Sequence, residues 1–111
     1  MTQNDKPVLI YATFPRGPLA EVVGRALVER RLAACVNILA GMTSIYRWEG
    51  ALQRDDEIVM VVKTTAARAE AAMQEIERRH PYETPAMLVL PIDGGSRAFL
   101  SWIARECAGS D

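Results

Sequence analysis

Apolar and polar positions follow two periods along the chain, one of two residues and one of three to four. Short runs of β-branched and aromatic residues predict strands at 8–14, 57–64 and 86–92, and the run 57–64 is long enough to be buried on both faces. A fourth strand is predicted at 33–48, where apolar residues alternate again. Gly41 interrupts this strand as a bulge or bend, and Glu49-Gly50 supplies a hairpin turn.

Apolar residues that recur at steps of three and four predict three helices. The first covers residues 18–31, with Pro18 in its first turn, and the second runs from a cap at Thr64 or Thr65 to the segment that begins at Arg79. A turn and cap at 93–96 precede a C-terminal helix, whose apolar face comprises Phe99, Trp102, Ile103 and Cys107.

The predicted order is β-α-β-β-α-β-α. Its first six elements predict an α+β, ferredoxin-like βαββαβ sandwich, in which helices cover one face of a four-stranded antiparallel sheet, and the seventh is an additional C-terminal helix. No linker or repeat divides the chain, so residues 1–111 are expected to form a single domain, with about residues 1–6 frayed.

The lengths of these elements predict an uncovered hairpin. Residues 33–48 can extend roughly 53 Å at ~3.3 Å per residue, whereas the helix at 18–31 spans only about 21 Å at ~1.5 Å per residue. The hairpin therefore extends past the helices although it carries Ile45, Tyr46 and Trp48, which are costly to leave together in water. We expect a second copy of the chain to cover it.

Composition argues against several classes of function. The formal net charge of -1 leaves no surplus positive charge for a phosphate backbone, so nucleic acid is not an expected partner. The sequence shows no signal peptide, and no apolar run approaches the ~20 residues that span a bilayer, so no membrane is expected. Cys35 and Cys107 lack CxxC spacing, which fits a reducing, cytoplasmic location.

The segment 79–85 joins a predicted helix to a predicted strand and holds His80, the single histidine of the chain. Its two prolines fix their own φ angles and restrict the residues before them. A stiff loop that carries an imidazole, the Tyr82 phenol and the Glu83 carboxylate is a candidate binding site, and a plain helix-to-strand spacer is the alternative.

Further candidate residues lie on the predicted strands. Glu57 and Lys63 are six positions apart on one strand face, either as charged ends that emerge into water or as an acid and a base at opposite ends of a groove. Tyr46 and Trp48 share a face, which favours an interface patch over a base-stacking platform. Cys35 lies between apolar residues, so it is a small core residue or, alternatively, a metal ligand.

The sequence shows no catalytic constellation. It contains no nucleophile-elbow, Walker or dinucleotide motif, and it designates neither a nucleophile nor an orienting acid for His80, so no enzyme activity is expected. With one histidine per chain, a complete metal-ligand set would need symmetry-related copies of His80 or Glu83.

Five segments resemble the CutA family of divalent-cation tolerance proteins in their order and spacing. They are residues 32–38 (Leu-Ala-Ala-Cys-Val-Asn-Ile), 44–50 (Ser-Ile-Tyr-Arg-Trp-Glu-Gly), 63–65 (Lys-Thr-Thr), 80–85 (His-Pro-Tyr-Glu-Thr-Pro) and 100–103 (Leu-Ser-Trp-Ile). The resemblance spans about residues 8–106. It implies a single CutA-like domain assembled as a PII-like homotrimer, and a cytoplasmic protein linked to tolerance of copper and other divalent ions, without enzyme activity.

The resemblance also implies copper ligands, which carry over position by position. Some members have two adjacent histidines before Pro-Tyr; here the second is His80, and Arg79 occupies the first position. Ala12 replaces a cysteine near the end of the first strand. His80 remains of that ligand set, with Cys35 of the Ala-Ala-Cys motif as the second metal candidate.

Two functional hypotheses follow. In the first, a homotrimer responds to metal by binding Cu²⁺, another divalent cation or a small ligand in crevices between subunits, and needs no cofactor. The crevice residues would be His80, Tyr82 and Glu83, with Trp48, Glu57 and Lys63 nearby. In the second, a PII-like structural or signalling trimer binds a partner protein or an anion, and metal binding is incidental.

Overall fold

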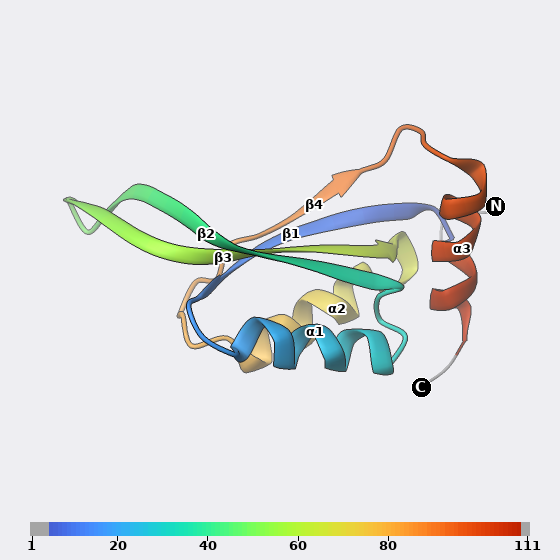
Figure 1. Ribbon diagram of the computed structural model, residues 1–111, viewed down its shortest axis with the longest axis horizontal. Helices are drawn as coiled ribbons and strands as arrows, with labels where there is room; N and C mark the ends of the chain where they lie inside the picture. The colour runs from blue at the N-terminus through green and yellow to red at the C-terminus, as the bar shows by residue number, and fades with distance from the viewer. Residues whose placement is uncertain (1–4, 110–111) are drawn as a thin grey trace.

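Four strands and three helices make up the computed structural model, which describes residues 5–109 (Figure 1). The strands are β1 (Pro7–Pro15), β2 (Cys35–Trp48), β3 (Ala51–Thr65) and β4 (Met87–Pro91). The helices are α1 (Leu19–Glu29), α2 (Ala66–Arg79) and α3 (Arg97–Ala108). This is the β-α-β-β-α-β-α order that the sequence predicts.

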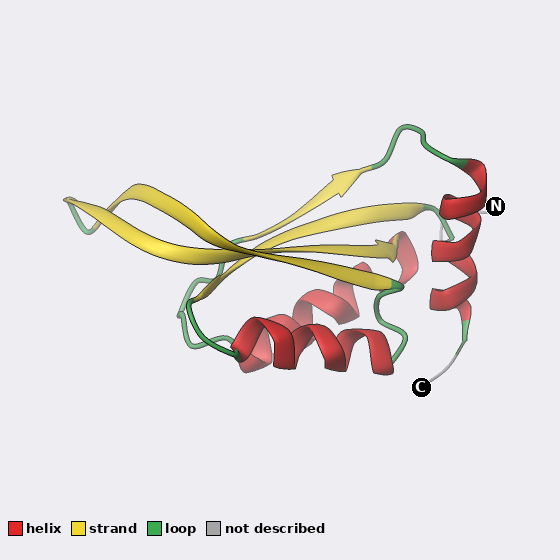
Figure 2. Ribbon diagram, viewed as in Figure 1, coloured by secondary structure: helices red, strands yellow, loops and turns green. Residues whose placement is uncertain are grey.

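The strands form one sheet in the order β2-β3-β1-β4, and every neighbouring pair is antiparallel. This is the strand order of the ferredoxin-like fold, which confirms the predicted fold class. Helices α1 and α2 cover one face of the sheet, and α3 lies across one end (Figure 2). Pro91 ends the edge strand β4, where a residue without a backbone N–H is tolerated.

The main core lies between the sheet and helices α1 and α2. Alternate residues of the two central strands point toward the helices and pack against apolar residues of both. The most deeply buried of these side chains are Ile10, Phe14, Met60, Val62, Val23, Leu27 and Ile76. Each large apolar side chain buried there contributes about 1.5–3 kcal/mol.

The opposite face of the sheet has no helix over it within residues 5–109. Val59 and Val61 lie on this open face and are only partly buried, while Ile58, Met60 and Val62 are buried against the helices. The prediction that strand 57–64 is buried on both faces is therefore wrong for the single chain, because both helices that cover the sheet lie on the same side of it.

Helix α3 makes a smaller core of its own at one end of the sheet. Ile103 and Cys107 pack there against Ala34, and burial raises the pKa of the Cys107 thiol. The Thr64 hydroxyl donates to the carbonyl of Leu32 at 2.7 Å, so it does not cap α2. Thr65 occupies the N-cap position of α2 but forms no capping hydrogen bond. Ser96 caps α3 as predicted, accepting from the Phe99 N–H.

The β2–β3 hairpin extends well past the helical layer, as predicted (Figure 1). Gly41, at φ 86°, sits in a register irregularity of β2, and Glu49 and Gly50 form the two-residue turn, both at positive φ. Ile45 is 68% exposed and Leu52 is 72% exposed near the tip. The structure thus contains the apolar, uncovered hairpin that the length mismatch indicates.

Both ends of α1 differ from the sequence prediction. Helix α1 starts at Leu19, after Pro18 as N-cap, and ends at Glu29, because Arg31 adopts a left-handed conformation at φ 56° and turns the chain toward β2. The predicted fraying of residues 1–6 falls mostly outside the described residues, although Lys6 lies within them and its carbonyl accepts from the Ala66 N–H. No helix within residues 5–109 is long and apolar enough to cross a membrane.

Candidate functional site

The main candidate site is a groove of about 610 Å³ on the open face of the sheet, where the hairpin leaves the helical layer. Residues of β1, β2, β3 and the α2–β4 loop line it. They are Tyr11, Thr13, Ser44, Ile45, Tyr46, Trp48, Asp55, Glu57, Tyr82, Glu83, Thr84 and Ala86. The lining contains four aromatic rings and three carboxylates, and it contains no lysine, arginine or histidine.

Strand alternation explains why these side chains share one face. On β3, Asp55 and Glu57 are two positions apart, so both point away from the helices. Tyr11 and Thr13 occupy the corresponding face of β1, next to β3. The residue just before β4 also lies beside β1, because the Thr13 N–H donates to the carbonyl of Ala86 at 3.4 Å.

Glu57 is a buried carboxylate at the floor of the groove, with only 6% of the residue exposed. The Tyr82 hydroxyl donates to Glu57 Oε2 at 3.1 Å. Burial and the adjacent negative charge of Glu57 raise the pKa of Tyr82 to about 12, so the phenol stays protonated and remains a donor at neutral pH. The interpretation of Glu57 as a strand end that emerges into water is therefore wrong.

A second phenol and carboxylate pair lies nearer the hairpin tip. The Tyr46 hydroxyl donates to Asp55, and this hydrogen bond raises the pKa of Tyr46. Trp48 lies two positions further along the same face of β2 and is about half exposed. The prediction that Tyr46 and Trp48 share a face is confirmed, since both line the groove.

His80 lies beside the groove but does not line it. Its ring stacks on Phe14 with centroids 4.9 Å apart, and its centroid lies 4.6 Å from that of Tyr82. Nε2 donates to the Thr13 carbonyl at 2.7 Å, and Nδ1 accepts from the Tyr82 N–H at 3.2 Å. Both ring nitrogens are thus used to hold the loop, and a metal ion at His80 would replace one of these hydrogen bonds.

Cys35 and Lys63 lie at the other end of the sheet, where they pair with each other across β2 and β3. Lys63 is six positions from Glu57 on β3, about 20 Å at ~3.3 Å per residue, and its ammonium donates to Asn37. Cys35 is partly buried beside a separate groove along α1. Lys63 therefore does not join the groove of its own chain, and Cys35 and His80 do not meet within one chain.

A buried ion cluster joins α1 to the end of α2, near the same loop. Glu75 is 4% exposed and is contacted by the guanidinium groups of Arg30, Arg78 and Arg79 at 3.1, 2.9 and 2.6 Å. Burial alone would raise the pKa of Glu75, but Arg79 and Arg78 outweigh it and lower that pKa. Arg79 is thereby committed to an ion pair within α2.

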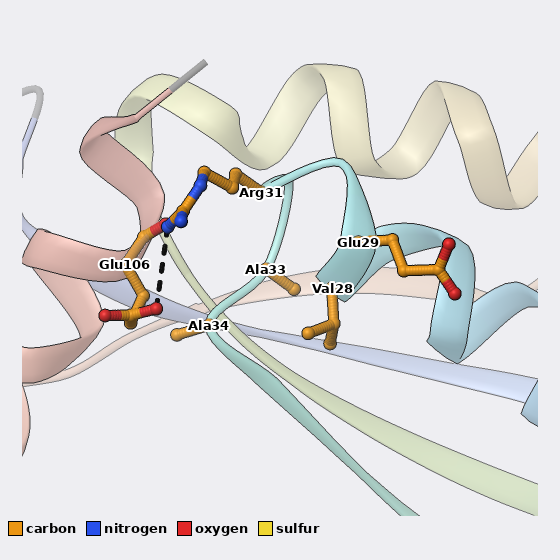
Figure 3. A pocket seen from close by; sticks show the side chains of 6 residues that line it. All are labelled: Val28, Glu29, Arg31, Ala33, Ala34 and Glu106. Atoms are coloured by element: carbon orange, nitrogen blue, oxygen red, sulfur yellow. Dashed lines mark hydrogen bonds and ion pairs between the residues drawn. The ribbon is translucent and has the colours of Figure 1, made fainter. Parts of the chain in front are cut away.

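A smaller cavity of about 120 Å³ lies where the loop after α1 meets α3 (Figure 3). Arg31 and Glu106 form an ion pair at 3.5 Å across its side, and Val28, Ala33 and Ala34 form its apolar part. The ion pair connects α3 to the α1–β2 loop, and the space left is much smaller than the groove. We assign this cavity to packing.

The structure brings together four of the predicted crevice residues, namely Trp48, Glu57, Tyr82 and Glu83. The metal assignments of His80 and Cys35 stay predictions, and no group of three histidine, cysteine or acidic residues placed to hold a metal occurs within residues 5–109. Asp55 was missed by sequence reasoning. The signal was available, because Asp55 precedes Glu57 by two positions on a strand and so must share its face.

Known proteins with similar sequences include divalent-cation tolerance proteins. The sequence profile described as CutA1 divalent ion tolerance protein matches residues 8–106. The divalent-cation tolerance protein CutA of Thermus thermophilus is 43% identical over 101 residues, which cover 91% of this chain and 97% of that protein.

Solved structures agree over nearly the whole chain. CutA from Xylella fastidiosa superposes with a TM-score of 0.89 at 38% identity, covering 92% of this chain and 98% of that one. A structure from Archaeoglobus fulgidus, described as a periplasmic divalent cation tolerance protein CutA, gives a TM-score of 0.87 at 36% identity and covers 91% and 98% of the two chains. The similarity therefore includes both the sequence and the complete fold.

Proposed function

The chain belongs to the CutA1 divalent ion tolerance protein family, and on that basis we propose that it acts in the cellular response to copper and other divalent ions as a cytoplasmic homotrimer. Its ligand, a divalent ion or a small molecule, binds in crevices between subunits. The groove is one wall of such a crevice, and the observation that carries the proposal is its position on an uncovered sheet face. We propose no catalytic role.

The trimer is supported by the apolar surface that one chain leaves in water. Ile45 and Leu52 on the hairpin, and Leu88 and Leu90 on the edge strand β4, are all exposed. Surfaces of this kind are normally covered by another chain. Light scattering at micromolar concentration should give three times the 12.3 kDa mass of one chain, and a monomer would refute this part of the proposal.

The metal part of the proposal rests on His80, whose imidazole lies against the groove residue Tyr82. Titration with Cu²⁺ should show weaker binding for His80→Ala than for the wild type. His80→Phe is the matched control, because it keeps a ring to stack on Phe14 but has no ring nitrogen. If both variants bind Cu²⁺ as tightly as the wild type, His80 is not a ligand.

The cytoplasmic location is supported by the two cysteines, which are both free. The similar protein from Archaeoglobus fulgidus is described as periplasmic, so the location needs a direct test. Cell fractionation with an antibody to the protein should recover it with cytoplasmic markers. Recovery in the periplasmic fraction would contradict this part of the proposal.

The second candidate is a PII-like structural or signalling trimer that binds a partner protein or an anion, with metal binding incidental. The observation in its favour is that both ring nitrogens of His80 already hold the loop. The three carboxylates of the groove argue against an anion there. Elemental analysis of freshly purified protein tests the metal part of the first candidate, because the second candidate predicts no stoichiometric metal.

A further inference from the structure

The charge of the groove limits the kind of ligand that it can accept. Asp55, Glu57 and Glu83 all line it, and no basic residue does. Water screens part of this negative charge, but a concave site lined by carboxylates still has a negative potential that attracts cations. A negatively charged ligand would meet repulsion at this face, and a cation would meet attraction.

The burial of Glu57 adds a second observation. A buried carboxylate is normally paired with a cation, because a charge that leaves water is costly unless another charge compensates it. Within the described part of the chain, Glu57 forms no ion pair, and the partner seen is the neutral phenol of Tyr82. The buried negative charge of Glu57 is thus hydrogen-bonded but not neutralised.

The walls of the groove distinguish between kinds of cation. Tyr11, Tyr46, Trp48 and Tyr82 contribute four aromatic rings. Aromatic faces attract ammonium and guanidinium groups within about 6 Å of the ring centroid, and tryptophan does so most strongly. Magnesium and calcium instead require several oxygen ligands at about 2.0–2.6 Å, which aromatic carbon cannot supply.

From these observations we propose that the groove binds a small organic cation, with Glu57 as the counter-ion of its ammonium or guanidinium group and the ring of Tyr82, whose hydroxyl donates to Glu57, as an aromatic face. The inference rests on the proposed function, in that it names the chemical class of the small ligand. The volume of about 610 Å³ is within the range of small-molecule sites. Phenol donors hold Glu57 and Asp55 in place before the ligand arrives.

The test compares choline with 3,3-dimethyl-1-butanol, which has the same shape but no charge. The protein has two tryptophans, so a Trp102→Phe variant leaves Trp48 as the single tryptophan, and its fluorescence reports occupancy of the groove. We expect saturable binding of choline and binding of the neutral alcohol weaker by about tenfold. Equal affinities, or no saturable binding of choline, would overturn the proposal.

Variants locate the site. Glu57→Gln in the same background should weaken choline binding by about tenfold, since the counter-ion is lost while the shape is kept. Glu70→Gln is the matched control, because Glu70 is an exposed carboxylate on α2 that does not line the groove. If Glu57→Gln binds choline as the wild type does, or if Glu70→Gln weakens binding equally, the assignment to Glu57 is refuted.

The oligomeric state, measured on the same samples, separates this inference from the proposed function. A trimer that does not distinguish choline from its neutral counterpart refutes the organic cation and leaves the trimer standing. A monomer that binds choline through Glu57 refutes the trimer and leaves the cation site standing.

Discussion

Glu57 and Glu75 are two glutamates buried to nearly the same degree, at 6% and 4% exposed, in opposite electrostatic surroundings. Glu75 lies at the contact between α1 and α2, within reach of three guanidinium groups. Glu57 lies at the floor of the groove and accepts from the phenol of Tyr82. Glu75 has its compensating cations within the fold, whereas Glu57 faces a space that a cation can enter.

This difference distinguishes a structural charge from a candidate binding charge. A buried ion pair that is complete within the chain stabilises the arrangement of its own helices, and removing one partner leaves the others uncompensated. A buried carboxylate with a neutral donor gains less from folding and keeps its capacity to attract a cation. Burial alone would have grouped the two residues together, and their partners separate them.

The largest effect is expected from Glu75→Gln. The change leaves the guanidinium groups of Arg30, Arg78 and Arg79 close together without their shared carboxylate. Because the arginines are partly exposed and screened, we expect a loss of about 2 kcal/mol rather than the larger cost of a fully buried pair. Urea unfolding at one fixed protein concentration measures the change, since assembly would make stability concentration-dependent.

Glu70→Gln is the control for Glu75→Gln, as an exposed glutamate of the same helix, and should change stability by less than ~0.5 kcal/mol. The effect of Glu75 should also depend on pH. Its folded pKa is lowered, so its stabilisation is complete above the ordinary value of 4.5 and is lost as the pH falls from there through the folded value. Equal losses for the two variants at neutral pH would contradict the ion-cluster account.

Tyr82→Phe should have a smaller effect, a loss of about 1 kcal/mol, because it removes one hydrogen bond to a charged group at a partly exposed residue. The raised pKa of Tyr82 adds a signature at high pH. The stabilisation is present below the ordinary value of 10.0 and is lost as the pH rises toward about 12. Tyr11→Phe, in the same groove, keeps Tyr82 and its contact with Glu57, so it should retain the alkaline loss of stability, and Tyr82→Phe should lack it.

The sequence predicted the order of elements, the fold class and the hairpin that extends past the helices, because these depend on local periodicity and on residue counts. Prolines and glycines with restricted or special φ angles, such as Pro91 and Gly41, also marked real features. The end of α1 was missed, since the left-handed conformation of Arg31 is a product of tertiary packing. The predicted burial of 57–64 on both faces was wrong, although the ferredoxin-like fold predicted from the same sequence already places both helices on one face of the sheet.

The candidate site was predicted in part, where local periodicity was enough to place a residue. Glu57 and Trp48 were found from strand alternation, and Tyr82 from its stiff loop, and all three line the groove. Lys63 shares the face of Glu57, but the six positions between them, about 20 Å at ~3.3 Å per residue, already place it far from Glu57 along the strand. The role of Arg79 depends on Glu75 being buried, and whether an acidic residue on a charged helix is buried cannot be read from its neighbours in sequence.

The smallest effect is expected from Glu57→Gln, which should change stability by less than ~0.5 kcal/mol at neutral pH. The amide oxygen can still accept from Tyr82, and the buried charge that it removes has no cation within the described chain to lose. The same urea assay as for Glu75→Gln measures it. A loss near 2 kcal/mol would mean that Glu57 is already paired, through a basic residue of another subunit, and would remove the distinction between the two glutamates. A near-zero change in stability, together with a tenfold loss of choline affinity, would identify Glu57 as a residue whose charge serves binding rather than folding.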